Sequence, residues 1–142
     1  MGKLGRYSAD RKKVESISAS KSVTVADCGT IFAITEAGSA ITLTLPTVAD
    51  AGKGWWARFV MIADSGGSGT DVTIAQNTSD TNNIVLATTC IDGANVTLAG
   101  DGFTFDVSAS VPGDWGEIWT DGTKWYGIVF SSASGGIVQY DA

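Results

Sequence analysis

The sequence predicts an all-β protein, a compact antiparallel β-sandwich or β-barrel with an extended N-terminal arm. Three observations predict this fold. Hydrophobic residues recur with a period of two, glycine-containing turns separate these runs at short intervals, and most basic residues gather at the N-terminus. The 142 residues are 44% hydrophobic and 17% charged, which fits one domain with a substantial core.

The strictest alternation is Ile-Thr-Leu-Thr-Leu at positions 41–45, and Pro46, which has no amide hydrogen to donate, ends that strand. The apolar run 55–62 is interrupted only by Arg58 and is expected to be a central strand. A single helical turn is expected at 47–51, and no amphipathic helix is predicted. Further strands are expected at 14–17, 23–25, 72–74, 84–86, 96–98, 103–107 and 137–140, the last of these either at home or on a neighbouring subunit.

A hairpin is expected in residues 115–130, which have Asp-Gly near their centre. Asp-Gly favours a two-residue type I′ turn. Such a turn places Ile118 opposite Trp125 on the inner face. It also places Trp119 opposite Lys124 on the outer face, where a cation–aromatic contact is expected.

Charge divides the chain into a basic leader and an acidic body. Six basic and two acidic residues give the first 21 positions a formal charge of +4, while three basic and thirteen acidic residues give the remainder −10. We therefore expect an extended arm at 1–21 and a single β-domain at 22–142. An arm that cannot bury itself docks on a partner, stays solvated or contacts nucleic acid, and the acidic body argues against nucleic acid. The expected arm contacts are Lys3, Arg6, Tyr7, Arg11, Lys12 and Lys13.

No chemistry is predicted for this chain. It contains no histidine, so Ser-His and Cys-His nucleophilic catalysis are absent, and we expect no enzyme, no cofactor and no metal. Its aspartates mostly belong to Asp-Gly turns, although calcium binding stays open. No apolar run is long enough to span a membrane, so no membrane partner is predicted. No secretion signal is expected either, and we therefore predict that the chain folds in a cytosol.

Tryptophans are the expected contact residues of the body. Trp55 and Trp56 are adjacent, so one should face inward and the other outward. The outward ring is expected either at a subunit interface or under a loop, and Trp119 is expected to be exposed.

Several segments resemble virion proteins of tailed bacteriophages, namely capsid decoration proteins, head fibres and tail-fibre tips. These segments are RKKVESI at 11–17, SVTVADCGTIF at 22–32, ITLTLP at 41–46 with AGKG at 51–54, and DGTKWY at 121–126. The resemblance covers most of the chain from about residue 11 to 130. It implies a β-tulip-like form of the fold and a homotrimer that sits on a capsid or on a fibre axis.

The resemblance and the charge division together predict a capsid decoration (cement) protein. Its arm would bind the major capsid protein, and the protein would stabilise the outer surface of the shell. The resemblance implies that it does so as a homotrimer. It would be made in the host bacterial cytoplasm and reside in the virion. The alternative is a head- or tail-fibre tip that binds a host receptor or glycan, with Trp119 or Tyr126 stacked on sugar rings. A third reading is a β-domain without a virion role.

Overall fold

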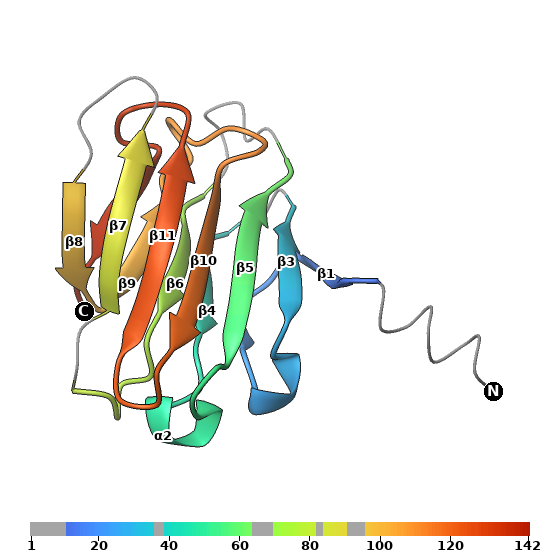
Figure 1. Ribbon diagram of the computed structural model, residues 1–142. Coiled ribbons are helices and arrows are strands. Elements are labelled where there is room, and N and C mark those ends of the chain that lie inside the picture. The colour runs from blue at the N-terminus through green and yellow to red at the C-terminus, as the bar shows by residue number, and fades with distance from the viewer. Residues whose placement is uncertain (1–10, 36–38, 64–69, 82–83, 91–95) are drawn as a thin grey trace.

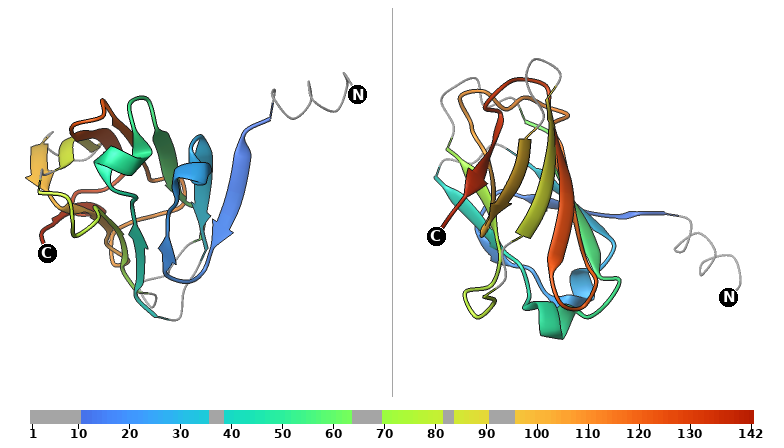
Figure 2. Two further views of the ribbon diagram at one scale, coloured as in Figure 1. Left: turned by 90° about the horizontal axis from the view of Figure 1, so that it is seen from below. Right: turned by 60° about the vertical axis from the view of Figure 1, so that its left-hand side comes forward.

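The computed structural model describes residues 11–35, 39–63, 70–81, 84–90 and 96–142, with the side chains of 88–90 and 96–99 excepted (Figure 1). Their strands form two sheets that pack face to face, so the predicted all-β sandwich is confirmed (Figure 2). The seven-stranded sheet has the order β1-β3-β5-β10-β11-β7-β8, and the five-stranded sheet has the order β12-β9-β6-β4-β2. The strands are β1 (Lys13–Ile17), β2 (Lys21–Ser22), β3 (Thr30–Ile34), β4 (Ile41–Thr44), β5 (Trp56–Met61), β6 (Val72–Ala75), β7 (Ile84–Cys90), β8 (Val96–Gly100), β9 (Gly102–Phe105), β10 (Trp115–Thr120), β11 (Trp125–Ser131) and β12 (Ile137–Tyr140).

Both sheets are mixed rather than purely antiparallel. The first six strands alternate between the sheets, with β1, β3 and β5 in one and β2, β4 and β6 in the other. A chain that crosses the sandwich after every strand returns to the same sheet in the same direction. The pairs β1–β3, β3–β5, β2–β4 and β4–β6 are therefore parallel. Antiparallel pairing follows where consecutive strands stay in one sheet, as in β7–β8 and β10–β11.

Aromatic rings from both sheets fill the middle of the sandwich. Phe32 and Phe59 stack at 5.2 Å between centroids, and Phe59 meets Phe103 of the opposite sheet edge-to-face at 6.2 Å. Phe103 in turn contacts Phe105 at 5.5 Å. All four rings are fully buried, and burial of each such side chain contributes about 1.5–3 kcal/mol relative to exposure.

Two short helical segments occur beside the strands in the described part of the chain. The predicted helical turn is present as α2 (Val48–Ala51), which Thr47 caps by accepting a hydrogen bond from the backbone N–H of Asp50 at 3.1 Å. The strand predicted at 23–25 is wrong, because the 3₁₀ helix η1 (Val25–Asp27) occupies part of it. The last strand, β12, pairs with β9 of its own domain.

The C-terminal hairpin forms, but its register is shifted by two residues from the predicted one. Trp119 lies opposite Tyr126 rather than Lys124, and their rings stack at 4.9 Å. A shift of two preserves the faces, so Ile118 and Trp125 are both fully buried as predicted.

The wider turn of the hairpin is built by the side chain of Asp121. One of its oxygens accepts hydrogen bonds from the backbone N–H groups of Thr123 and Lys124, at 2.8 and 2.9 Å. Hydrogen bonds from the Thr123 hydroxyl and from these two amides lower the pKa of Asp121 to about 2. Among the described residues only glycines have positive φ, so Asp121 does not take the conformation that a type I′ turn requires.

Gly116 of β10 provides the space for Phe103 of the opposite sheet. A Cβ atom on Gly116 would lie 2.6 Å from Cζ of Phe103 and 2.9 Å from Cγ1 of Val129. We expect Gly116→Ala to lower the free energy of unfolding by about 1–3 kcal/mol through overpacking, measured by urea denaturation. Adding Phe103→Leu should recover part of that loss, because the smaller side chain vacates the contact. Additive losses from the two substitutions would contradict this packing account.

Candidate functional site

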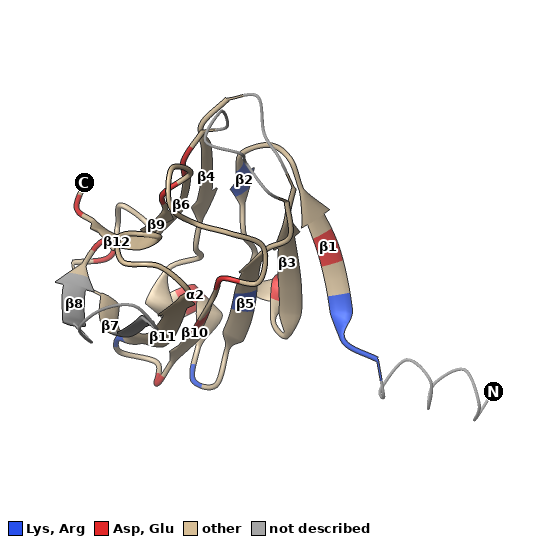
Figure 3. Ribbon diagram, turned by 90° about the horizontal axis from the view of Figure 1, so that it is seen from above, with Lys and Arg blue, Asp and Glu red and all other residues tan. Residues whose placement is uncertain are grey.

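The two long sides of the sandwich differ. On one side β8 leads directly into β9 through Asp101, whose N–H donates to the carbonyl of Tyr140 in β12 at 2.8 Å, so backbone joins the two sheets. On the other side β1 and β2 are the outermost strands of their sheets (Figure 3). Residues 18–20 connect β1 to β2 at one end of this side, and ion pairs between side chains bridge the two sheets along the rest of it. We call this second side the open edge.

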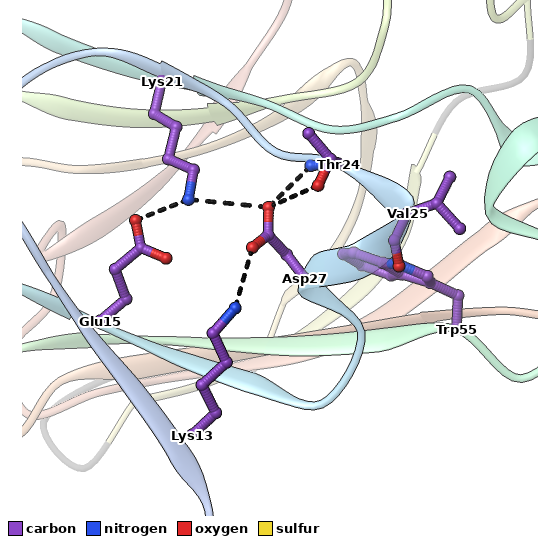
Figure 4. Close-up of polar contacts among 7 residues, drawn as sticks. All are labelled: Lys13, Glu15, Lys21, Thr24, Val25, Asp27 and Trp55. Atoms are coloured by element: carbon purple, nitrogen blue, oxygen red, sulfur yellow. Dashed lines mark hydrogen bonds and ion pairs between the residues drawn. The ribbon is translucent and has the colours of Figure 1, made fainter.

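Ion pairs bridge the open edge (Figure 4). Lys21 of β2 lies 2.6 Å from Glu15 of β1 and 3.6 Å from Asp27 of η1. Lys13 lies 3.3 Å from the other oxygen of Asp27. The ammonium of Lys21 also lies 5.2 Å from the centroid of the buried Phe32 ring, in a cation–π contact. Charged side chains therefore connect the two sheets at the margin of the apolar core.

Asp27 is the buried centre of this cluster, with 5% of its surface exposed. Burial raises the pKa of its carboxyl, but hydrogen bonds from the backbone and hydroxyl of Thr24, a hydrogen bond from Lys13 and the charge of Lys21 outweigh burial, so the net pKa is lowered. The backbone N–H and the hydroxyl of Thr24 donate to Asp27 at 2.9 and 3.0 Å. The indole of Trp55 donates to the carbonyl of Val25 at 3.1 Å, which holds η1 against the core.

The structure differs from the predicted arm at 1–21. Residues 13–17 form β1, paired in parallel with β3, and Ile17 is 3% exposed within the core. The expectation that the leader becomes ordered only by binding a partner is therefore wrong for residues 13–21. Its charges reach acidic partners within the chain, which a count of net charge along the sequence does not reveal.

The remaining arm residues lie at the start of β1 or before it. Arg11 and Lys12 are exposed immediately before the strand, and Lys13 is exposed while bonded to Asp27. Lys3, Arg6 and Tyr7 lie outside the described residues. Figure 3 shows basic segments at the start of β1 and at β2, with one acidic segment within β1, and several acidic segments on the far side, around β6, β9 and the C-terminus.

The outer side of the seven-stranded sheet forms a second surface, which we call the aromatic face. Its apolar members alternate with the buried residues of β5, β10 and β11. They are Trp56, Val60, Trp115, Trp119, Tyr126, Ile128 and Phe130, of which Trp119 and Ile128 are 46% and 43% exposed. Trp119 lies opposite both Trp56 and Tyr126 in the strand register, so three rings form one row across the sheet.

An ion pair lies in the middle of the aromatic face. Nε and Nη2 of Arg58 donate to a single oxygen, Oε2 of Glu117, at 2.9 and 2.7 Å. The guanidinium also lies 4.8 Å from the ring centroid of Trp115, which stacks on Phe130. A shallow hollow of about 300 Å³ adjoins this pair, and Glu117, Trp119, Tyr126, Ile128, Val85 and Ala87 line it.

The three predicted contact tryptophans have different environments. Trp55 is 3% exposed and packs edge-to-face on Trp125, so this ring faces inward and is not a surface residue. Trp56 faces outward and is half-buried, and Trp119 is exposed. Sequence reasoning missed Arg58 and Glu117 as a pair, although the alternation in two tryptophan-containing strands places both on the outer face.

No group of three or more His, Cys, Asp or Glu side chains in the described segments is arranged to hold a metal ion. No helix in the described part of the chain is long and apolar enough to cross a membrane. Cys28 is an exposed free thiol. Comparison with models of protein families, with curated proteins and with solved structures found no match for this chain.

The lowered pKa of Asp27 makes the open edge sensitive to acid. A depressed carboxyl pKa contributes stability above its unfolded value, near 3.8, and that contribution disappears as pH falls through the lower folded value. We expect Asp27→Asn to cost about 1–3 kcal/mol at pH 7, since a buried charge-assisted network loses its acceptor. The difference from the wild type should shrink below pH 4 in urea titrations.

Lys13→Gln is the matched control for this prediction. The Lys13 side chain is 56% exposed, so its removal should cost less than about 1 kcal/mol. Equal costs for the two variants, or a cost for Asp27→Asn that does not change between pH 7 and pH 2, would contradict the role assigned to Asp27.

Proposed function

We propose that this protein acts by binding and not by catalysis, and that it decorates and stabilises the outer surface of a bacteriophage capsid. The observation that carries the proposal is the open edge, where the outermost strand β1 adjoins exposed basic residues. Its partner would be the major capsid protein. The homotrimer and the location on the virion surface are parts of the same proposal and are supported by the resemblance of short segments described above.

The open edge has the properties that strand addition requires. An outermost strand can pair its free backbone groups with a strand from another chain. Val14 of β1 is 61% exposed, so apolar surface is also available beside the backbone. Glu15, Lys13 and Lys21 already have partners, so a strand that covers this edge would leave none of these charges unpaired.

The charge distribution supports a defined orientation. Arg11 and Lys12 stand at the start of the docking strand, and the acidic side of the domain lies opposite. Docking through the basic side directs the acidic side toward solvent, where its net charge keeps particles apart. A protein that binds only the assembled shell stabilises that shell by its own binding free energy.

A fibre tip that binds a host receptor is the alternative, and the exposed ring of Trp119 favours it. The two roles differ in stoichiometry. Decoration requires many copies on each particle, whereas a fibre tip requires few and its loss abolishes adsorption to the host.

Two matched substitutions test the decoration role. Val14 of β1 and Val138 of β12 are both exposed valines on outermost strands of the two sheets, at 61% and 37%. Purified protein is added to shells of the encoding phage that lack it, and bound copies are counted after sedimentation. We expect the wild type to saturate at many copies and to raise the temperature at which shells rupture.

Val14→Asp should bind the shells at least tenfold more weakly, since a charge enters the docking surface, whereas Val138→Asp should bind like the wild type. Equal binding by both variants would remove β1 from the interface. Few copies on the particle together with lost host adsorption would favour the fibre tip instead.

A further inference from the structure

We propose that the aromatic face of the seven-stranded sheet is a binding site for a neutral saccharide. The site is centred on Trp119, Tyr126 and Glu117 of β10 and β11. It does not depend on decoration, because β3 separates even the nearest strand of the site, β5, from the docking strand β1. Loss of either activity is therefore expected to leave the other intact.

A row of aromatic side chains forms the platform of this site. Trp56, Trp119 and Tyr126 come from three adjacent strands and lie opposite one another in register, and Val85 of β7 continues the row beyond Tyr126. Trp119 and Tyr126 stack with 24° between their planes, and Trp119 is 46% exposed. The negative face of an aromatic ring attracts the weakly positive C–H groups on the apolar side of a sugar ring.

The adjoining hollow supplies a boundary for such a ligand. Its volume of about 300 Å³ lies at the lower end of the range for small-molecule sites, roughly 300–1,000 Å³. Tyr126, Ile128 and Val85 make most of its lining apolar. A single sugar ring fits a hollow of this kind, while the row of rings extends beyond it and can contact a second one.

Glu117 supplies the polar contact that orients a saccharide. Both hydrogen bonds from Arg58 go to Oε2, and no hydrogen bond reaches Oε1 from any described residue. Glu117 lines the hollow, so Oε1 is an available acceptor for a sugar hydroxyl. Arg58 fixes the carboxylate from the other side and is itself held over Trp115 at 4.8 Å.

The charge of the site favours a neutral polyol over other ligands. Arg58 and Glu117 compensate one another, so the face attracts neither a phosphate backbone nor an anionic surface. A dry interface with a second protein would bury this ion pair together with the open acceptor, at a cost in desolvation. A hydrated saccharide leaves water at the pair and donates a hydroxyl to it.

The test is a glycan array of neutral hexose and N-acetylhexosamine oligosaccharides, followed by calorimetric titration of the oligosaccharides that bind. We expect the wild type to bind at least one neutral member and Trp119→Ala to weaken that binding at least tenfold. Trp119→Phe, which keeps an aromatic ring, should retain an intermediate affinity. Val138→Ala, on the other sheet, is the control and should bind like the wild type.

Two further measurements test whether the variants fold and whether they change the size of the protein in solution. Circular dichroism checks that the variants fold, which the 46% exposure of Trp119 favours. Light scattering measures the size of the wild type and of Trp119→Ala. The proposal is overturned if no neutral oligosaccharide binds, if only anionic ones bind, or if Trp119→Ala leaves affinity unchanged. It is also overturned if that substitution dissociates an oligomer, which would make the face a contact between copies.

Discussion

The carboxylate of Asp27 is the interaction on which the open edge of this sandwich depends. It joins η1 to both outermost strands, because it accepts hydrogen bonds from Thr24 and from Lys13 of β1 and forms an ion pair with Lys21 of β2. The remaining long side is closed by backbone, as β8 turns into β9. Without this carboxylate, the only side-chain ion pair left among the described residues of this margin would be that of Lys21 with Glu15, beside the backbone connection 18–20. A strand held in place by charge is ordered and yet keeps an unpaired outer edge.

The same alternation that builds the core also produces the aromatic face. In β5 the inward residues are Ala57, Phe59 and Met61, and the outward ones are Trp56, Arg58 and Val60. A central strand with large side chains on both faces covers the core on one side and leaves apolar surface on the other. A sheet covered by a second layer on one side only therefore presents this surface to solvent, and extensive exposed apolar surface marks a binding site in most soluble proteins.

Local patterns in the sequence predict much of this fold, but they do not predict which strands pair over long distances in the sequence. Alternation at 41–45 and the flanking Pro46 predict β4, because both properties are local. The direction of the strands depends on which sheet each strand joins, and no residue records that choice. The predicted hairpin register differs from the observed one by two residues, because the Asp121 side chain builds a wider turn than Asp-Gly alone predicts. The predicted arm at 1–21 is too long because Lys13 and Asp27 are fourteen residues apart in the sequence and meet only after folding.

The sequence also predicts part of the aromatic face, namely the side on which its tryptophans lie, but not its ion pair. Exposure of Trp119 follows from period-two alternation, and so does the opposite orientation of Trp55 and Trp56. The contact between Arg58 and Glu117 joins residues 59 apart in the sequence, so it required the pairing of β5 with β10. That pairing turns two ordinary surface charges into a neutral, oriented pair within an apolar face. Because the pair uses only one oxygen of Glu117, the arrangement combines flat apolar surface with one directed acceptor, which is the combination that distinguishes a ligand site from a merely hydrophobic patch.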